Sequence, residues 1–326
     1  MAFSDVLGQK RAIDILRKDL DSGNLYGGYL FTGPAGVGKK LVALNFAKAI
    51  NCQRKKVDCC DDCSSCRRMN KMNHPNLRLI SPERRSLRIE QIRDLKTRVG
   101  CKIYEGKKKI WILDESDKLT PEASNSLLKI LEEPPHNLVI ILITHLPALL
   151  PATVVSRCKI IEFSPLKKTD LHNLLLKNNT PSELIPLVSE LAQGSIGEAL
   201  KLVKEEEIFQ EREKIFNILT GKASSLEEVF DLCENWSNKE NSYFQTFLNI
   251  ILYFLRDILL LKLDPACSLI NVDKKQEMLN LKDNYSFRCL CEGIEVLKKV
   301  RHLLISNVSP RLTFEWMWMK LLFKNP

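Results

Sequence analysis

The sequence of 326 residues has no apolar run long enough to cross a membrane and no excess of acidic charge. Its most apolar helical stretch, Leu248–Leu263, contains Arg256 and Asp257 and is shorter than the about 20 apolar residues that a spanning helix needs. The first residues, Met1–Ala12, lack the basic-then-apolar pattern of a secretory signal. These absences predict a cytoplasmic protein without a membrane segment.

Glycine and proline are scarce, at 13 and 14 residues, and no convincing internal repeat is present. Hydrophobic residues make up 44% of the chain and charged residues 27%, which is typical of folded globular proteins. This composition excludes a collagen-like or disordered chain. Because single hydrophobic cores stop growing at about 250–300 residues, we expect two or three domains.

The net charge of +9 is unevenly placed along the chain. Residues 1–164 contain 28 basic and 18 acidic residues, whereas residues 165–326 contain 21 and 22. The segment Arg78–Lys109 alone has 11 basic and four acidic residues. A basic half beside a neutral half indicates a polyanionic partner, and a solvated charged face is the alternative.

Short apolar runs alternate with helical patterns in the first half of the chain. Near-continuous apolar runs are typical of parallel strands that are covered on both faces. The helix that begins at Pro121 has Thr120 as its cap and is ended by Pro134 and Pro135. We therefore predict an α/β domain with a doubly wound parallel sheet. The predicted strands are Tyr29–Thr32, Leu77–Ile80, Ile110–Leu113, Leu138–Thr144 and Lys159–Phe163.

Strand patterns stop after Pro165. Residues 165–205 have the pattern of a short helical unit, with turns near Pro181 and Gly194. Residues 206–326 are amphipathic helix throughout, interrupted near Gly221, Asn241, Pro265 and Ser309. The sequence thus predicts three parts: an α/β domain over 1–164, a small helical domain over 165–205 and a helical domain over 206–326.

A glycine-rich loop of sequence GPAGVGKK follows the first predicted strand and precedes a helical pattern. Gly33, Gly36 and Gly38 let backbone N–H groups point at phosphate oxygens, and Lys39 would reach the outer phosphates. The next position normally has a Ser or Thr hydroxyl that binds Mg²⁺, but here it is Lys40. We expect a degenerate nucleotide site that is poorly suited to metal-assisted hydrolysis, and binding of ATP with Mg²⁺ stays open.

The predicted strand Ile110–Leu113 runs into Asp114 and Glu115. In phosphoryl-transfer enzymes an acid at such a strand end holds Mg²⁺, and a neighbouring carboxylate orients the attacking water. Both acids are present, so part of a catalytic site is intact. Two exposed carboxylates at a strand–helix junction are the alternative.

Five of the 11 cysteines fall within residues 52–66. Cys52, Cys60, Cys63 and Cys66 have the spacing C-x7-C-x2-C-x2-C, which suits four thiolates around one tetrahedral Zn²⁺. A ferredoxin cluster would need a further cysteine three residues later, and none is there. Four protein ligands predict a structural ion. The adjacent Cys59 is an alternative to Cys60 with less regular spacing.

Together these motifs resemble the bacterial DNA polymerase III clamp-loader subunits, AAA+ proteins of the gamma/tau and delta-prime type. The resemblance rests on GGYLFTGPAGVGKK, the cysteine cluster, ILDESDKLTPEASNSLLKILEEPP and VVSRC, and on FSDVLGQ and NVSPRLTFE near the two ends. It implies an AAA+ module, a helical lid and a helical collar that holds subunits together. It also implies that Arg157, in the SRC motif, acts as an arginine finger on a neighbour's ATP. Thr144 is placed where the family has its sensor residue.

The departures from the family pattern favour the delta-prime type. Lys40 replaces the metal-binding hydroxyl, and Gly197 replaces the arginine of the lid. The resemblance implies a stator subunit with little or no ATP hydrolysis, acting with gamma/tau and delta subunits, the sliding clamp and primer-template DNA. The alternatives are an active gamma-type ATPase, favoured by Asp114 and Glu115, and a stand-alone nucleic-acid-binding AAA+ protein, favoured by Arg78–Lys109.

Overall fold

The computed structural model describes residues 2–83, 86–99, 107–222, 225–239, 241–306 and 308–322. The chain divides into two compact units, Met1–Leu171 with Gly194–Glu198, and His172–Gln193 with Ala199–Pro326. The first unit is α/β and the second is helical. The finer division at residues 164 and 205 stays a prediction.

A parallel sheet of five strands, in the order β2-β3-β4-β1-β5, forms the centre of the first unit. All five predicted strands are confirmed: the first and third begin one residue earlier than predicted, and the fifth ends one residue earlier. The strands are β1 (Gly28–Thr32), β2 (Leu77–Ile80), β3 (Lys109–Leu113), β4 (Leu138–Thr144) and β5 (Lys159–Glu162).

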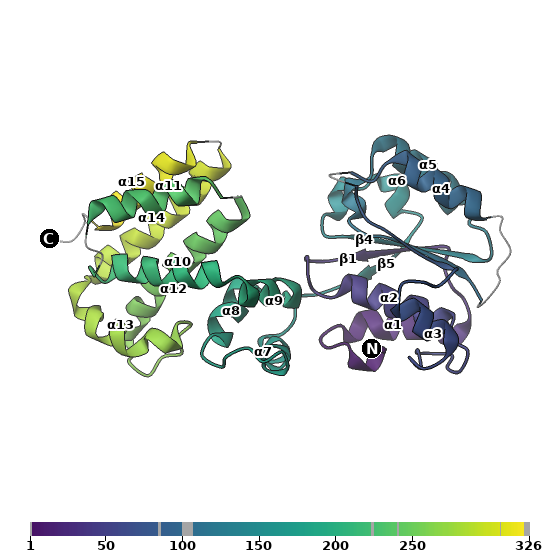
Figure 1. The fold of residues 1–326 in the computed structure, drawn as a ribbon, viewed down its shortest axis with the longest axis horizontal. Helices are drawn as coiled ribbons and strands as arrows, with labels where there is room; N and C mark the ends of the chain where they lie inside the picture. Colours follow the sequence, from purple (N-terminus) through teal and green to yellow (C-terminus); the bar gives the residue numbers. More distant parts are fainter. Residues whose placement is uncertain are drawn as a thin grey trace. The chain divides into compact units, whose positions relative to one another are not determined.

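Helices cover both faces of this sheet, which explains the continuous apolar runs (Figure 1). Successive side chains of a strand point to opposite faces. Tyr29 and Phe31 accordingly pack in the core with α1 and α2, whereas Leu30 packs in the core with α4 and α5. One face is covered by α1 (Lys10–Ser22), α2 (Lys39–Ile50) and α3 (Ser64–Asn70), and the other by α4 (Ile89–Val99), α5 (Pro121–Glu132) and α6 (Ala152–Val155).

The start of α5 shows how local sequence sets an element boundary. The Thr120 side chain accepts a hydrogen bond from the Ala123 N–H at 3.3 Å, and Pro121 occupies the first turn. Proline has no N–H to lose there, and the cap satisfies one of the free donors at the helix start. The helix ends at Glu132, before Pro134, as the sequence predicts.

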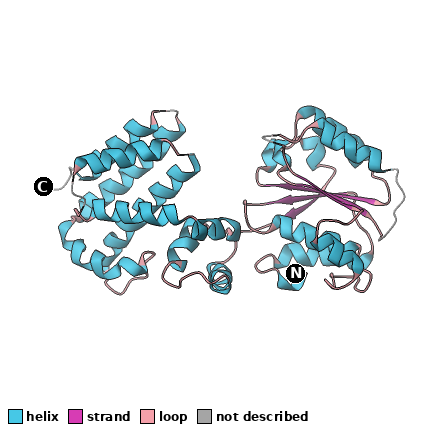
Figure 2. Ribbon diagram, viewed as in Figure 1, coloured by secondary structure: helices cyan, strands magenta, loops and turns pink. Residues whose placement is uncertain are grey.

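The described part of the second unit is helical (Figure 2). An aromatic cluster fills its core, in which Trp236 stacks on Phe247 and meets Phe314 edge to face. The helices are α8 (Ile185–Leu191), α10 (Glu206–Leu219), α11 (Leu226–Ser237), α12 (Asn241–Leu263), α13 (Lys275–Leu281), α14 (Phe287–Ile305) and α15 (Pro310–Leu322). Two further helices, α7 (Lys168–Lys177) and α9 (Ile196–Lys204), are shared between the two units.

The apolar helix α12 contains a fully buried carboxylate. Asp257 accepts hydrogen bonds from the N–H groups of Ile270 and Asn271 and from the Asn271 amide, and it pairs with Arg256 at 2.7 Å. A buried charge is tolerated when its lone pairs are satisfied in this way. No helix among the described residues is long and apolar enough to span a membrane.

Candidate nucleotide site and metal centre

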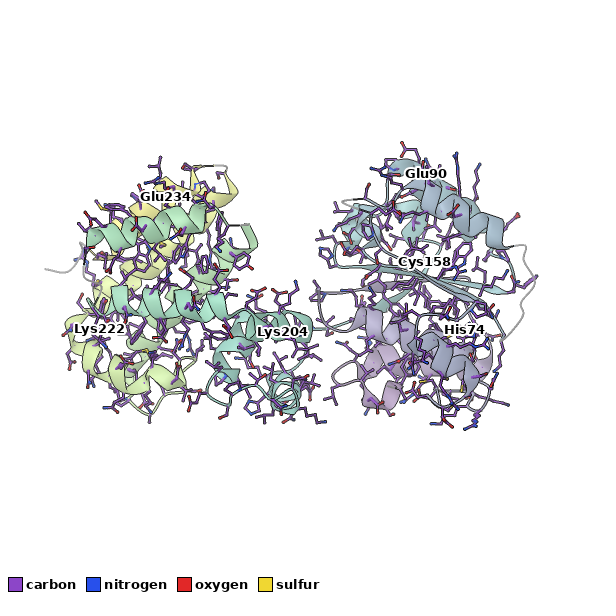
Figure 3. The ribbon with its side chains drawn as sticks, in the orientation of Figure 1. His74, Glu90, Cys158, Lys204, Lys222 and Glu234 are labelled. Atoms are coloured by element: carbon purple, nitrogen blue, oxygen red, sulfur yellow. The ribbon has the colours of Figure 1, made fainter. Side chains whose placement is uncertain are left out.

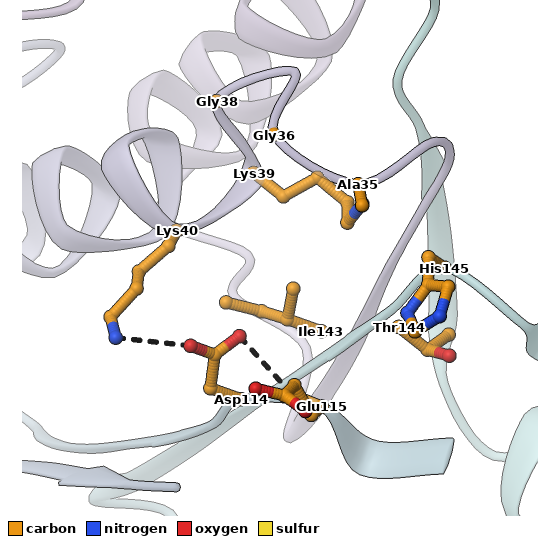
Figure 4. Close-up of a pocket in the computed structure, with 10 residues that line it drawn as sticks. All are labelled: Ala35, Gly36, Gly38, Lys39, Lys40, Asp114, Glu115, Ile143, Thr144 and His145. Atoms are coloured by element: carbon orange, nitrogen blue, oxygen red, sulfur yellow. Dashed lines mark hydrogen bonds and ion pairs between the residues drawn. The ribbon is translucent and has the colours of Figure 1, made fainter. Parts of the chain in front are cut away.

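A cavity of about 460 Å³ lies at the carboxyl ends of β1, β3 and β4 (Figure 4). Here the chain leaves β1 towards one face of the sheet and leaves β3 and β4 towards the other. In open α/β sheets this is the usual position of a ligand site. Seven of the eight residues predicted for the nucleotide site line it, and the eighth, Gly33, lies at the base of the same loop. The lining residues are Ala35, Gly36, Gly38, Lys39, Lys40, Asp114, Glu115, Ile143, Thr144 and His145.

Lys39, the first residue of α2, is almost completely buried beside this cavity. Its Nζ donates to the carbonyl oxygens of Gly33 and Pro34, each at 2.5 Å. Burial lowers the pKa of Lys39 to about 8, and the carboxylates of Asp114 and Asp117 oppose that shift. The side chain is therefore still a cation at neutral pH, placed beside a space that could hold an anion.

Lys40 forms an ion pair with the acid that would hold the metal. Its Nζ lies 3.0 Å from Asp114 Oδ2, while Asp114 Oδ1 accepts the Glu115 N–H at 3.1 Å (Figure 4). Glu115 itself pairs with Lys118 and has a left-handed backbone conformation. Hard oxygen ligands are what Mg²⁺ requires, and an ammonium group supplies none. The residues present therefore do not fit a Mg²⁺ ion at this position.

Thr144, at the end of β4, directs its hydroxyl to a buried neighbour. Its Oγ1 donates to Asp117 Oδ1 at 2.6 Å and accepts the Leu146 N–H at 3.0 Å. The ring of His145 lies 3.6 Å from the same Asp117 oxygen. Asp117 is a site residue that sequence reasoning missed, although its position three residues after Asp114 was a usable signal.

The segment Gly194–Glu198 lies directly against the phosphate loop, within the first unit. The Gly197 N–H donates to the Gly36 carbonyl at 3.0 Å. A side chain at position 197 would place its Cβ 3.0 Å from Gly36 Cα, and one at position 36 would meet Ser195 Oγ at 2.2 Å. Gly36 has a φ of +70°, which favours glycine, whereas a Cβ at position 197 would be tolerated only if the loop moved by a few tenths of an ångström. Glycine is therefore the residue best accommodated at both positions.

Arg157 is not part of this cavity. It precedes β5, whose first residue lies beside Tyr29 at the start of β1, whereas the phosphate loop follows the end of β1. A five-residue strand is about 16 Å long. Arg157 therefore lies at the amino ends of the strands, and the cavity lies at their carboxyl ends. The guanidinium pairs with Glu132 at 2.9 Å and donates to the Thr153 carbonyl at 3.0 Å. It is about one-third exposed.

Four cysteines form a second candidate site, between α2 and α3. The sulfur atoms of Cys52, Cys60, Cys63 and Cys66 all lie within 4.8 Å of one another. Backbone N–H groups of Lys55, Cys63 and Cys66 donate to three of these sulfurs. Burial disfavours the Cys60 thiolate, but N–H donors from Asp62 and Cys63 outweigh it and lower the pKa of Cys60 to about 6.

These features fit a structural Zn²⁺, because thiolate is the form that binds zinc and four sulfurs complete a tetrahedron. The structure groups Cys60 and not Cys59 with the other three cysteines. His74, which is labelled in Figure 3, is engaged elsewhere. Its Nδ1 accepts the Asn76 N–H, and its Nε2 lies 3.1 Å from Ser65 Oγ. The cluster is therefore a closed site of four cysteines.

The fold and the cavity define an AAA+-type phosphate-loop protein whose metal position holds a lysine. Two family models described as DNA polymerase III, delta subunit, and its C-terminal part match residues 8–167 and 206–324. The chain belongs to the family of DNA polymerase III clamp-loader subunits of the delta-prime type.

The curated relatives that match include DNA polymerase III subunits of bacteria. The chain is 28% identical to the DNA polymerase III subunit delta' of Bacillus subtilis over 92% of both chains. It is 32% identical to the subunit tau/gamma of Haemophilus influenzae over 71% of this chain and 34% of that protein. A solved gamma subunit-related protein of Thermotoga maritima aligns over 95% of this chain, with 18% identity and a TM-score of 0.46.

Proposed function

We propose that the chain is a stator subunit of the bacterial clamp loader, which helps to place the sliding clamp on primed DNA and hydrolyses little or no ATP itself. The observation that carries this proposal is the ion pair between Lys40 and Asp114. It occupies the acid that would hold Mg²⁺, and hydrolysis in this class of site depends on that metal. Thr144, held by Asp117, and Gly197, which has no cation to offer, add to the same conclusion.

The second part of the proposal is that Arg157 acts on the nucleotide of an adjacent ATPase subunit. The Arg157 side chain is exposed and lies at the amino ends of the strands, away from the chain's own cavity at their carboxyl ends. Both observations support action in trans. A guanidinium placed against a transferring phosphoryl group stabilises the charge that develops there. In the assembly, the Arg157–Glu132 pair would exchange for a contact with that phosphate.

The remaining functional assignments follow from the family. The partners would be gamma/tau and delta subunits, the clamp, and primer-template DNA reached through the complex in the cytoplasm. Residues 206–326 would form the collar and 165–205 the lid. For the basic segment Arg78–Lys109, the support for a DNA contact in the assembly is its charge and not the family, and residues 84–85 and 100–106 of it lie outside the described structure.

The decisive experiment compares ATP hydrolysis by the purified chain alone and with a gamma-type subunit present. We expect no turnover by the chain alone, and Arg157→Ala should lower the rate of the complex at the affected interface by tenfold or more, because such arginines contribute about 10³–10⁵ in related hydrolases. Arg11→Ala, which removes an exposed arginine of α1, is the control for charge.

Two results would contradict the proposal. Substantial hydrolysis by the chain alone would favour the gamma-type ATPase, for which the intact Asp114 and Glu115 and the open cavity are the supporting observations. An unchanged rate of the complex with Arg157→Ala would remove the role of this arginine. Tight DNA binding by the isolated chain would favour the stand-alone nucleic-acid-binding alternative.

A further inference from the structure

The ion pair at the cavity has a consequence for the ligand, separate from its effect on hydrolysis. Lys40 is one of the residues that line the cavity, and its half-exposed side chain places Nζ 3.0 Å from Asp114. An ammonium group has three donors, and Asp114 uses one of them. The other two are available to oxygen atoms in the cavity. Lys39 similarly directs two donors to loop carbonyls, at 2.5 Å each, and keeps a third.

The pairing of the two lining carboxylates disfavours a metal ion in the cavity. Asp114 is neutralised by Lys40, and Glu115 is neutralised by Lys118. Asp117 is not among the lining residues, and its Oδ1 accepts the Thr144 hydroxyl. Among the described lining residues, Lys39 is the cation that pairs with carbonyl groups and not with a carboxylate. It lies at the N-terminus of α2, a 12-residue helix whose free N–H groups also attract anions.

A divalent cation would have to break the Lys40–Asp114 pair and then remain close to the displaced ammonium. A polyphosphate anion needs neither change, because it accepts the unused donors while the pair stays intact. We propose that this cavity binds the polyphosphate chain of a nucleotide as the free anion, without a divalent cation, and that the Lys40 ammonium supplies the charge that Mg²⁺ supplies elsewhere. The proposal deepens the stator function, since it concerns the same non-hydrolysing site.

Titration calorimetry on the full chain tests this proposal, with ATP and inorganic tripolyphosphate as the two probes. Each is titrated in buffer depleted of divalent cations by chelating resin and again with excess Mg²⁺. EDTA is avoided because it would compete for zinc at the four-cysteine cluster. We expect ATP to bind without Mg²⁺ and to bind several-fold more weakly with it, because Mg·ATP has two fewer negative charges.

The variant Lys40→Thr should reverse this preference, since it restores the hydroxyl and frees Asp114. We expect Mg²⁺ to tighten ATP binding to this variant by at least tenfold. Lys18→Met, which removes an exposed lysine of α1, should behave as the unsubstituted chain. Zinc content and the melting temperature confirm that each variant is folded.

Three results would overturn the proposal: Mg²⁺ tightening binding to the unsubstituted chain, no binding of ATP under either condition, or ATP binding with no binding of tripolyphosphate. The unsubstituted chain decides all three, so they do not depend on the folding of a variant. None of these results depends on Arg157 or on a partner subunit. Failure here is therefore distinguishable from failure of the stator role.

Discussion

Single residues decide what the nucleotide site can do, and they act through their pairing. Lys40 matters because its ammonium reaches Asp114, and Thr144 because its hydroxyl is held by Asp117. The loop sequence alone predicts that a metal-binding hydroxyl is missing. It does not predict that the acid at the end of β3 is already neutralised, because that depends on how two strands and a helix meet.

Phosphate binding should depend on pH through Lys39. Burial lowers the pKa of Lys39 to about 8, and a bound polyphosphate should raise it again, so binding takes up a proton above pH 8. We expect the affinity for ATP without Mg²⁺ to be about tenfold weaker at pH 9 than at pH 7. Lys39→Met should bind more weakly and without this dependence. A flat profile for the unsubstituted chain would contradict the assignment.

The lowered pKa of Lys39 has the opposite effect on folding stability, which should rise with pH where nucleotide affinity falls. Between pH 8 and 10.5 the unfolded chain keeps a proton on Lys39 that the folded chain has lost. Stability rises with pH wherever the unfolded state binds more protons, so the Lys39 contribution to the free energy of unfolding increases through this window.

At the scale of elements, boundaries with local causes were predictable and those with distant causes were not. The five strands follow from apolar runs, and α5 follows from Thr120 and the prolines. Helix α3 was not predicted. It begins at a cysteine of the cluster, where Cys63 Sγ accepts the Cys66 N–H, so its cap is also a candidate metal ligand.

The metal centre can be tested without disturbing the start of α3. Serine is a good N-cap, so Cys63→Ser keeps the cap and removes one ligand. We expect one equivalent of zinc in the unsubstituted chain and almost none in this variant. The melting temperature of the first unit should fall by about 5–10 °C if the ion contributes 2–3 kcal/mol.

Cys59→Ser is the matched control, because Cys59 is buried and adjacent but is not grouped with the other sulfurs. It should retain the full equivalent of zinc. Retention of zinc by Cys63→Ser, or its loss from Cys59→Ser, would show that the ligand set is wrong.

At the scale of the whole molecule, the two units have separate cores and separate polar centres. The sequence shows Arg256 and Asp257 only as charges that interrupt an apolar helix. The structure shows that Asp257 joins α12 to the segment at Ile270 and Asn271, which is 13 residues away in the chain. The hydrophobic periodicity of a sequence shows which face of a helix is apolar. It does not show which distant loop packs against that helix, so it cannot reveal such a polar centre.

The variant Asp257→Asn should destabilise the second unit alone. It replaces an acceptor of several N–H donors with an amide, and breaking a satisfied buried charge costs about 3–5 kcal/mol. We expect the melting transition of the second unit to move to lower temperature while zinc content and ATP binding are unchanged. Loss of zinc or of nucleotide binding would contradict the independence of the two units.

The contact between Gly36 and Gly197 limits which side chains position 197 can accept. An arginine at position 197 would place its Cβ 3.0 Å from Gly36 Cα, which is a tight contact, so the loop would have to move by a few tenths of an ångström. A hydroxyl at position 40 needs one substitution, whereas a cation at position 197 also needs this small shift of the loop. Selection of this chain for ATP turnover should therefore yield a hydroxyl at position 40 before an arginine at position 197.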